Sequence, residues 1–174
     1  MSLDSGELRR HWRWSQGHET GGRIERQSLQ YRGLILAGGT LARAVFRDCT
    51  FADVELSGAS LAQAELAGCT WQGGSMELTS FQGASLSRCA FSGTRLVRAH
   101  FFEATVDHSA FRDLTLARSK WKGAVATDCV FERVCLDQGF LAGSRFVRCT
   151  FTDCTFEAAR LQDAVFEDCT GQPA

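Results

Sequence analysis

Residues 81–111 read FQGAS LSRCA FSGTR LVRAH FFEAT VDHSA F, and their regular spacing indicates the type of fold. Every fifth residue in it is large and apolar, and two residues before each stands Ala, Cys, Ser or Thr. A period of five matches neither a helix of 3.6 residues per turn nor the two-residue alternation of a strand. It predicts short extended segments joined by turns, with the large and the small residue both pointing inward.

The same register continues in both directions. From Tyr31 to Phe166 it covers 28 positions, all apolar, of which only Ala126 is small. The position two residues earlier is Ala, Cys, Gly, Ser or Thr in 23 of 28 cases. The exceptions are Leu29, Leu34, Val54, Leu114 and Val134. We therefore expect a repeat domain over residues 31–170, an N-terminal cap over 1–30 and a short tail over 171–174. Leu8, Trp12 and Trp14 are the residues expected to cover the first coil.

A second period of 20 residues lies on top of the first. It is clearest in the cysteines that precede an aromatic residue by two positions: Cys49, Cys69, Cys89, Cys129 and Cys149. Since 20 is four fives, four sides should form one square coil, and like residues should stack from coil to coil. About seven coils at ~4.8 Å per layer make a rod roughly 34 Å long. One side should carry an aromatic column: Tyr31, Phe51, Trp71, Phe91, Phe111, Phe131 and Phe151.

Several fives read as a small residue, a variable residue and a large apolar residue, as in Ala59-Ser60-Leu61, Ala64-Glu65-Leu66, Ala84-Ser85-Leu86 and Cys149-Thr150-Phe151. Over about residues 29–170 the chain resembles the pentapeptide-repeat family, whose motif is roughly Ala-Asp/Asn-Leu-x-x. The resemblance implies an all-β fold, a right-handed quadrilateral parallel β-helix. The chain departs from the motif where Thr, Ser, Val, Arg or Glu replaces Asp/Asn. Hexapeptide repeats are excluded, because a period of six would lose phase within a few repeats.

Composition narrows the class of protein. The 174 residues contain 19 basic and 20 acidic side chains, and this balance predicts no nucleic-acid or membrane partner. No apolar run reaches 18 residues and no secretory signal is visible, which favours a cytoplasmic protein. Seven of the eight cysteines occupy the small inward position, Cys135 being the exception, so we interpret them as free thiols, with metal binding and disulfides as alternatives. The four histidines are expected at surface or interface positions.

No pattern of catalytic residues is present, and the repeat leaves no ligand pocket in its filled core. Gly38-Gly39 and Gly73-Gly74 lack the strand, helix and Lys of a phosphate loop. Asp107-His108-Ser109 is no triad, because Ser109 takes an inward position. We therefore expect no enzyme, no cofactor and no metal site.

Charge is segregated along the chain. Residues 48–87 contain no Lys or Arg, residues 88–122 contain seven basic residues against three acids, and residues 123–174 contain eight acids against four Arg. The 20-residue stacking brings basic and aromatic residues of the middle band together. These form a candidate partner-binding surface: Arg98, His100, Phe102, Arg118, Lys120, Lys122 and Phe140.

Two functions follow. The first is a non-catalytic scaffold that binds another protein through this surface. The second comes from the resemblance, since the Qnr proteins and their mycobacterial relatives mimic duplex DNA and protect gyrase or topoisomerase IV from poisons such as fluoroquinolones, and so confer antibiotic resistance. Its acidic surface would be Asp48, Asp53, Glu55, Glu65 and Glu77. A role beside a secretion or toxin system is a third, weaker possibility.

The last coil has little chain after Phe166 to cover it. We expect it to pair with a second copy and form a homodimer, since an uncovered coil leaves an open edge. The candidate residues are Phe151, Phe156, Leu161 and Phe166.

Overall fold

The computed structural model describes residues 3–18 and 21–173. Its strands form two parallel sheets in which each inner strand pairs with the strands 20 residues before and after it, as in Phe111 with Phe91 and with Phe131. The first sheet has the order β1 (Glu25–Gln27), β3 (Val45–Arg47), β5 (Glu65–Ala67), β7 (Ser85–Ser87), β9 (Thr105–Asp107), β11 (Val125–Thr127), β13 (Arg145–Val147) and β15 (Val165–Glu167). The second has the order β14 (Thr150–Thr152), β12 (Val130–Cys135), β10 (Ala110–Thr115), β8 (Ala90–Ser92), β6 (Thr70–Gln72), β4 (Thr50–Ala52) and β2 (Gln30–Arg32).

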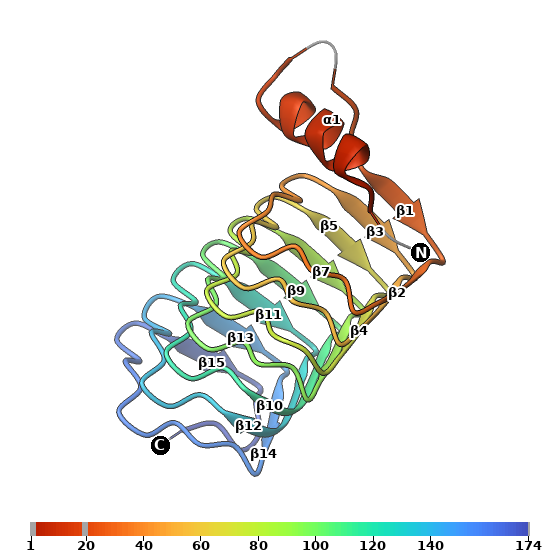
Figure 1. Ribbon diagram of the computed structural model, residues 1–174. Coiled ribbons are helices and arrows are strands. Elements are labelled where there is room, and N and C mark those ends of the chain that lie inside the picture. Colours follow the sequence, from red (N-terminus) through yellow and green to blue (C-terminus); the bar gives the residue numbers. More distant parts are fainter. Residues whose placement is uncertain (1–2, 19–20, 174) are drawn as a thin grey trace.

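Two further ladders of single parallel bridges complete the four sides. One runs from Ile35 through Glu55 and Ser75 to Thr115, and the other runs unbroken from Thr40 to Arg160. The chain is therefore a parallel β-helix of about seven turns, as the period of 20 predicted (Figure 1). The β-helix begins before residue 31, where the repeat domain was predicted to start, because β1 already pairs with β3.

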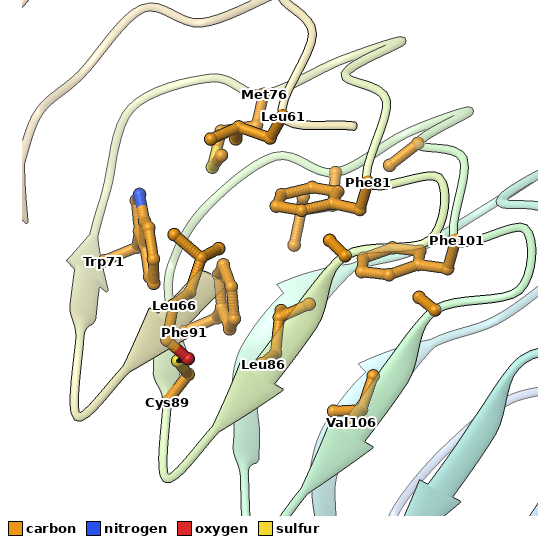
Figure 2. Close-up of a cluster of buried hydrophobic side chains, with 14 of the residues drawn as sticks. Leu61, Leu66, Trp71, Met76, Phe81, Leu86, Cys89, Phe91, Phe101 and Val106 are labelled. Atoms are coloured by element: carbon orange, nitrogen blue, oxygen red, sulfur yellow. Dashed lines mark hydrogen bonds between the residues drawn. The ribbon is translucent and has the colours of Figure 1, made fainter. Parts of the chain in front are cut away.

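The large inward residues fill the interior as stacked columns. In the aromatic column the rings of Trp71 and Phe91 have centroids 4.6 Å apart and lie 5° from parallel. A second column stacks Phe81 on Phe101 at 4.8 Å and Phe101 on Trp121 at 4.2 Å. Figure 2 shows the two columns facing each other across the interior. Residues 20 positions apart are in direct contact here, because they occupy equivalent positions in neighbouring coils.

Every corner uses a left-handed backbone conformation. The third residue of each five has positive φ at every step from Ser28 to Asp168. Gly tolerates this conformation without cost and Asp tolerates it better than most residues, which explains their frequency there. Arg, Gln, Leu and Glu also occupy corners, and the sequence pattern did not reveal that these positions are strained.

The helix α1 (Ser5–Ser15) lies at the N-terminal end of the rod (Figure 1). Asp4 caps it by accepting a hydrogen bond from the amide of Glu7 at 2.8 Å. His11 of the helix is buried together with Leu3 and Ile24, and Leu8 of the helix packs partly buried against the core. The prediction that Trp12 covers the first coil is wrong, because half of its side chain is exposed. No helix of the described residues is long and apolar enough to cross a membrane.

His11 also departs from the surface position expected for it. It is fully buried, and its Nδ1 accepts a hydrogen bond from the amide of Ile24 at 3.0 Å. Burial lowers the pKa of His11, so the imidazole under the cap is held neutral.

Candidate functional site

The middle coils carry a groove of about 660 Å³ along one corner of the rod. We call it the cationic groove. It is lined by Leu78, Arg98, His100, Arg118, Lys120, Gln138, Phe140, Ala158 and Arg160. Four of these side chains are cations and none is an acid.

Two rows of residues build the cationic groove, and each row takes one residue from each coil. The first row is the corner position, occupied in successive coils by Leu78, Arg98, Arg118, Gln138 and Ala158. The second row is the bridge ladder that links His100 to Lys120, Lys120 to Phe140 and Phe140 to Arg160. Because the corner lies two residues before the bridge position, the rows run side by side along the rod. The groove is a direct product of the 20-residue period.

The cations of the groove differ from the arginines on the other sides. Elsewhere an arginine commonly meets a carboxylate one coil away: Arg133 binds Asp113 at 2.5 Å and Arg148 binds Asp128 at 2.7 Å. These hydrogen bonds lower the pKa of both carboxyl groups. Within residues 3–18 and 21–173, no ion pair involves the four cations of the groove. No carboxylate of the described residues therefore neutralises their charge.

The polar contacts inside the groove orient these cations without neutralising them. Arg118 donates from Nε to the side-chain oxygen of Gln138 at 2.9 Å. Lys120 places its Nζ 6.0 Å from the ring centroid of Phe102. Burial, and then the positive charge of Lys120, lower the pKa of His100. Near neutral pH the charge of the groove thus comes from Arg and Lys.

The structure divides the predicted surface. Phe102 and Lys122 line a separate groove of about 400 Å³ with Gln82, Glu103, Gly123 and Gly143. The two grooves flank the same side of the rod. Lys120 of the cationic groove lies over the ring of Phe102, which lines the smaller groove. Phe102 and Phe140, both predicted to belong to the partner-binding surface, are half-buried.

Four lining residues were missed from sequence: Leu78, Gln138, Ala158 and Arg160. The signal for three of them was present, because Gln138 and Ala158 lie 20 and 40 residues after Arg118, and Arg160 lies 20 residues after Phe140. Leu78 is half exposed at the other end, where it adds an apolar contact to that of Phe140.

The five acids proposed as a DNA-mimicking surface do not share one side. Glu65 lies on β5, where Arg23 and Arg47 pair with it, and Glu77 pairs with Arg95 on another side. Asp48 and Asp53 occupy two different corners. The acids of residues 48–87 are therefore spread over several sides of the rod, and some of them are neutralised by arginines.

One His–carboxylate cluster lies on a different corner from the cationic groove. The ligand atoms of Asp107, His108 and Asp128 are within 4.8 Å of one another. Arg148 donates two hydrogen bonds of 2.7 Å to the two oxygens of Asp128, and a cation there would have to displace it. We assign no metal to this cluster. The eight cysteines are all free thiols.

The last coil has a partly open apolar end. Phe151 is buried, whereas Phe156, Leu161 and Phe166 are only partly covered although they pack against the core. Phe166 stacks on Phe146 with 5.0 Å between centroids, so its inner face is covered and its outer face is not.

Comparison with known structures gives several similar solenoids. QnrB1, a plasmid-mediated fluoroquinolone resistance protein, is 16% identical, covers 83% of this chain and 84% of its own, and has a TM-score of 0.41. HetL, a pentapeptide repeat protein involved in heterocyst differentiation regulation in the cyanobacterium Nostoc sp. strain PCC 7120, is 17% identical over 94% of each chain, with a TM-score of 0.37. A pentapeptide repeat protein from the thylakoid lumen of Arabidopsis thaliana is 20% identical over 69% of this chain and 77% of its own, with a TM-score of 0.26. A search of curated proteins finds no match.

The family described as pentapeptide repeat region matches residues 26–101 and 68–141. These two overlapping stretches cover most of the ladder, and the parallel four-sided coil has the geometry that a five-residue repeat requires. The chain therefore belongs to the pentapeptide repeat family.

Proposed function

We propose that this protein is a non-catalytic scaffold that binds another protein through the cationic groove and the smaller groove beside it. The observation that carries the proposal is the concentration of unpaired cations beside two half-buried aromatic rings on one side of the rod. Interfaces are enriched in aromatic residues and Arg, and hot spots centre on them. A rigid rod with a filled interior offers such a surface with little ordering cost on binding.

The test is capture of a partner from an extract of the native cells. The wild type is compared with a variant carrying Phe102→Ser, Lys120→Gln and Phe140→Ser, and a matched control carries Arg112→Gln on another side. A partner enriched by the wild type and the control should be lost from the triple variant. Equal enrichment by all three proteins would exclude this surface, provided that their circular dichroism spectra and melting temperatures agree.

Mimicry of DNA toward gyrase or topoisomerase IV is the alternative that the resemblance raised. No observation of the structure favours it, because the acids are spread over several sides and two of them are paired with Arg. A gyrase supercoiling assay with and without a fluoroquinolone separates the two functions. We expect no effect of the protein at micromolar concentration, and protection of gyrase would contradict the scaffold proposal.

We also propose that the partly open last coil packs against a second copy of the chain. Phe156, Leu161 and Phe166 supply the apolar contact. Light scattering should show a dimer that Phe156→Ser and Leu161→Ser dissociate. A monomer at high concentration would exclude this contact.

A further inference from the structure

The ligand of the cationic groove can be described more closely from its length, charge and borders. This inference depends on the proposed function, because it concerns the same surface. We propose that the groove binds a short, extended, acidic segment of the partner protein, in which several carboxylates meet Arg98, Arg118, Lys120 and Arg160 and an apolar side chain meets Phe140.

The length follows from the stacking of the coils. The cations begin at Arg98 and end at Arg160, three coils later. At ~4.8 Å per coil they span roughly 14 Å. An extended chain rises about 3.3 Å per residue, so four to five residues cover this distance. A segment of this size presents about as many carboxylates as the groove has cations.

The negative charge expected of the ligand follows from the absence of carboxylate partners for the cations of the groove among the described residues. Several arginines on the other sides meet a carboxylate one coil away, as Arg112 meets Glu132 at 3.1 Å. The corner row of the groove instead places Arg98 directly beside Arg118, since these residues occupy the same position in successive coils. Like charges one coil apart repel each other, and a ligand that inserts carboxylates between them relieves this repulsion.

The borders favour a short acidic peptide over a nucleic acid. Glu77 stands one coil before Arg98, and Asp137 and Glu157 stand one residue before the corner row in the coils of Phe140 and Arg160; none of the three lines the groove. Asp137 accepts a hydrogen bond from the amide of Glu157 at 2.8 Å, which holds its carboxylate in place. A long phosphate backbone that extends past Arg98 would meet Glu77, whereas a short segment ends before it.

Apolar contacts add a second element of recognition. Phe140 is half-buried in the bridge row between Lys120 and Arg160, so its ring forms part of the groove floor. Leu78 adds an exposed apolar side chain at the other end. A segment with carboxylates around one aromatic or aliphatic residue matches this order of charge and apolar surface.

The experiment uses the full chain and a fluorescein-labelled peptide of about ten residues with four glutamates around one phenylalanine. Fluorescence polarisation should show saturable binding that weakens when salt is raised. The variant Arg98→Gln, Arg118→Gln, Lys120→Gln should bind about tenfold more weakly, because three ion pairs with the peptide are lost. The matched control Arg112→Gln, Arg148→Gln, on other sides of the rod, should bind as the wild type does.

A charge swap tests the direction of the interaction and does not depend on a loss of binding. Arg118→Glu with Lys120→Glu should reject the glutamate peptide and bind its lysine counterpart. A single-stranded oligonucleotide of equal charge should bind more weakly than the peptide.

Three results would overturn the inference: no binding of the peptide, binding unchanged by the triple substitution, or tighter binding of the oligonucleotide. If the peptide fails while capture of a partner still depends on Phe102, Lys120 and Phe140, the acidic segment is wrong and the proposed function stands. If capture is independent of these residues, the proposed function itself is wrong.

Discussion

Replacing Phe111 by Ala tests the stacked interior most directly. Phe111 is completely buried and stacks on Phe91 and on Phe131 with 5.0 Å between centroids in both cases. It also meets Trp121 edge-on at 6.2 Å. The substitution leaves a cavity in the middle of the column and removes a ring from two stacked pairs at once.

The expected loss can be worked from these contacts. Phe→Ala substitutions in cores cost about 3–5 kcal/mol, and the layers above and below Phe111 are held apart by the backbone ladder, so the cavity cannot collapse. We expect a loss of about 4 kcal/mol in the free energy of unfolding. Phe111→Leu keeps most of the volume and should cost only about 1–1.5 kcal/mol. Phe151→Ala lies in the last coil, where relaxation is easier, and should cost less than Phe111→Ala.

Urea unfolding followed by circular dichroism and tryptophan fluorescence measures the effect. With a urea slope of about 2 kcal/mol per M, the midpoint for Phe111→Ala should fall by about 2 M. Thr105→Ala, at an exposed position of β9, serves as the control and should change the free energy by less than about 0.5 kcal/mol. A loss below about 1 kcal/mol for Phe111→Ala would refute the inward column and the square coil built on it.

Three further predictions concern the corners, the cap and the thiols. Gly74→Ala should be less stable than Gly143→Ala by at least about 1 kcal/mol in thermal unfolding. Both residues have a left-handed backbone conformation, but an added Cβ at Gly74 would lie 2.2 Å from a backbone oxygen, whereas no atom lies within 4 Å of an added Cβ at Gly143. Equal losses would contradict the crowding. Burial lowers the pKa of His11, so the contribution of its neutral imidazole to stability is complete above about pH 6.5 and is lost as the pH falls through the lowered pKa. His11→Gln should therefore reduce the change in melting temperature between pH 7.5 and pH 5. An unchanged pH profile would argue against a buried neutral imidazole. Burial raises the pKa of Cys69 to about 12, whereas Cys169 is partly exposed. At pH 8 a thiol reagent should therefore modify Cys169 in the native protein and Cys69 only after unfolding, as measured by mass spectrometry. Early modification of Cys69 would show that its coil opens.

The repeating part of the molecule could be predicted from the spacing of its residues. The period of five identified which side chains point inward, and the period of 20 gave the register, so the pairing of Phe111 with Phe131 could be written down beforehand. This succeeds because in a solenoid the contacts are those between neighbouring coils, and neighbours in space are a fixed distance apart along the chain. Five of the seven predicted surface residues accordingly meet in the cationic groove.

Features outside the period became visible only in the folded molecule. His11 is buried because of how α1 docks on the first coil, and no repeat marks that contact. Phe102 and Lys122 line their own groove because a separation of two residues crosses the side of the rod. The acids of residues 48–87 form a band along the chain but point in several directions, since each turn at a corner rotates the next five residues to another side. Charge counted along a chain predicts a surface only after each residue has been assigned to its side, and that assignment is a property of the folded coil.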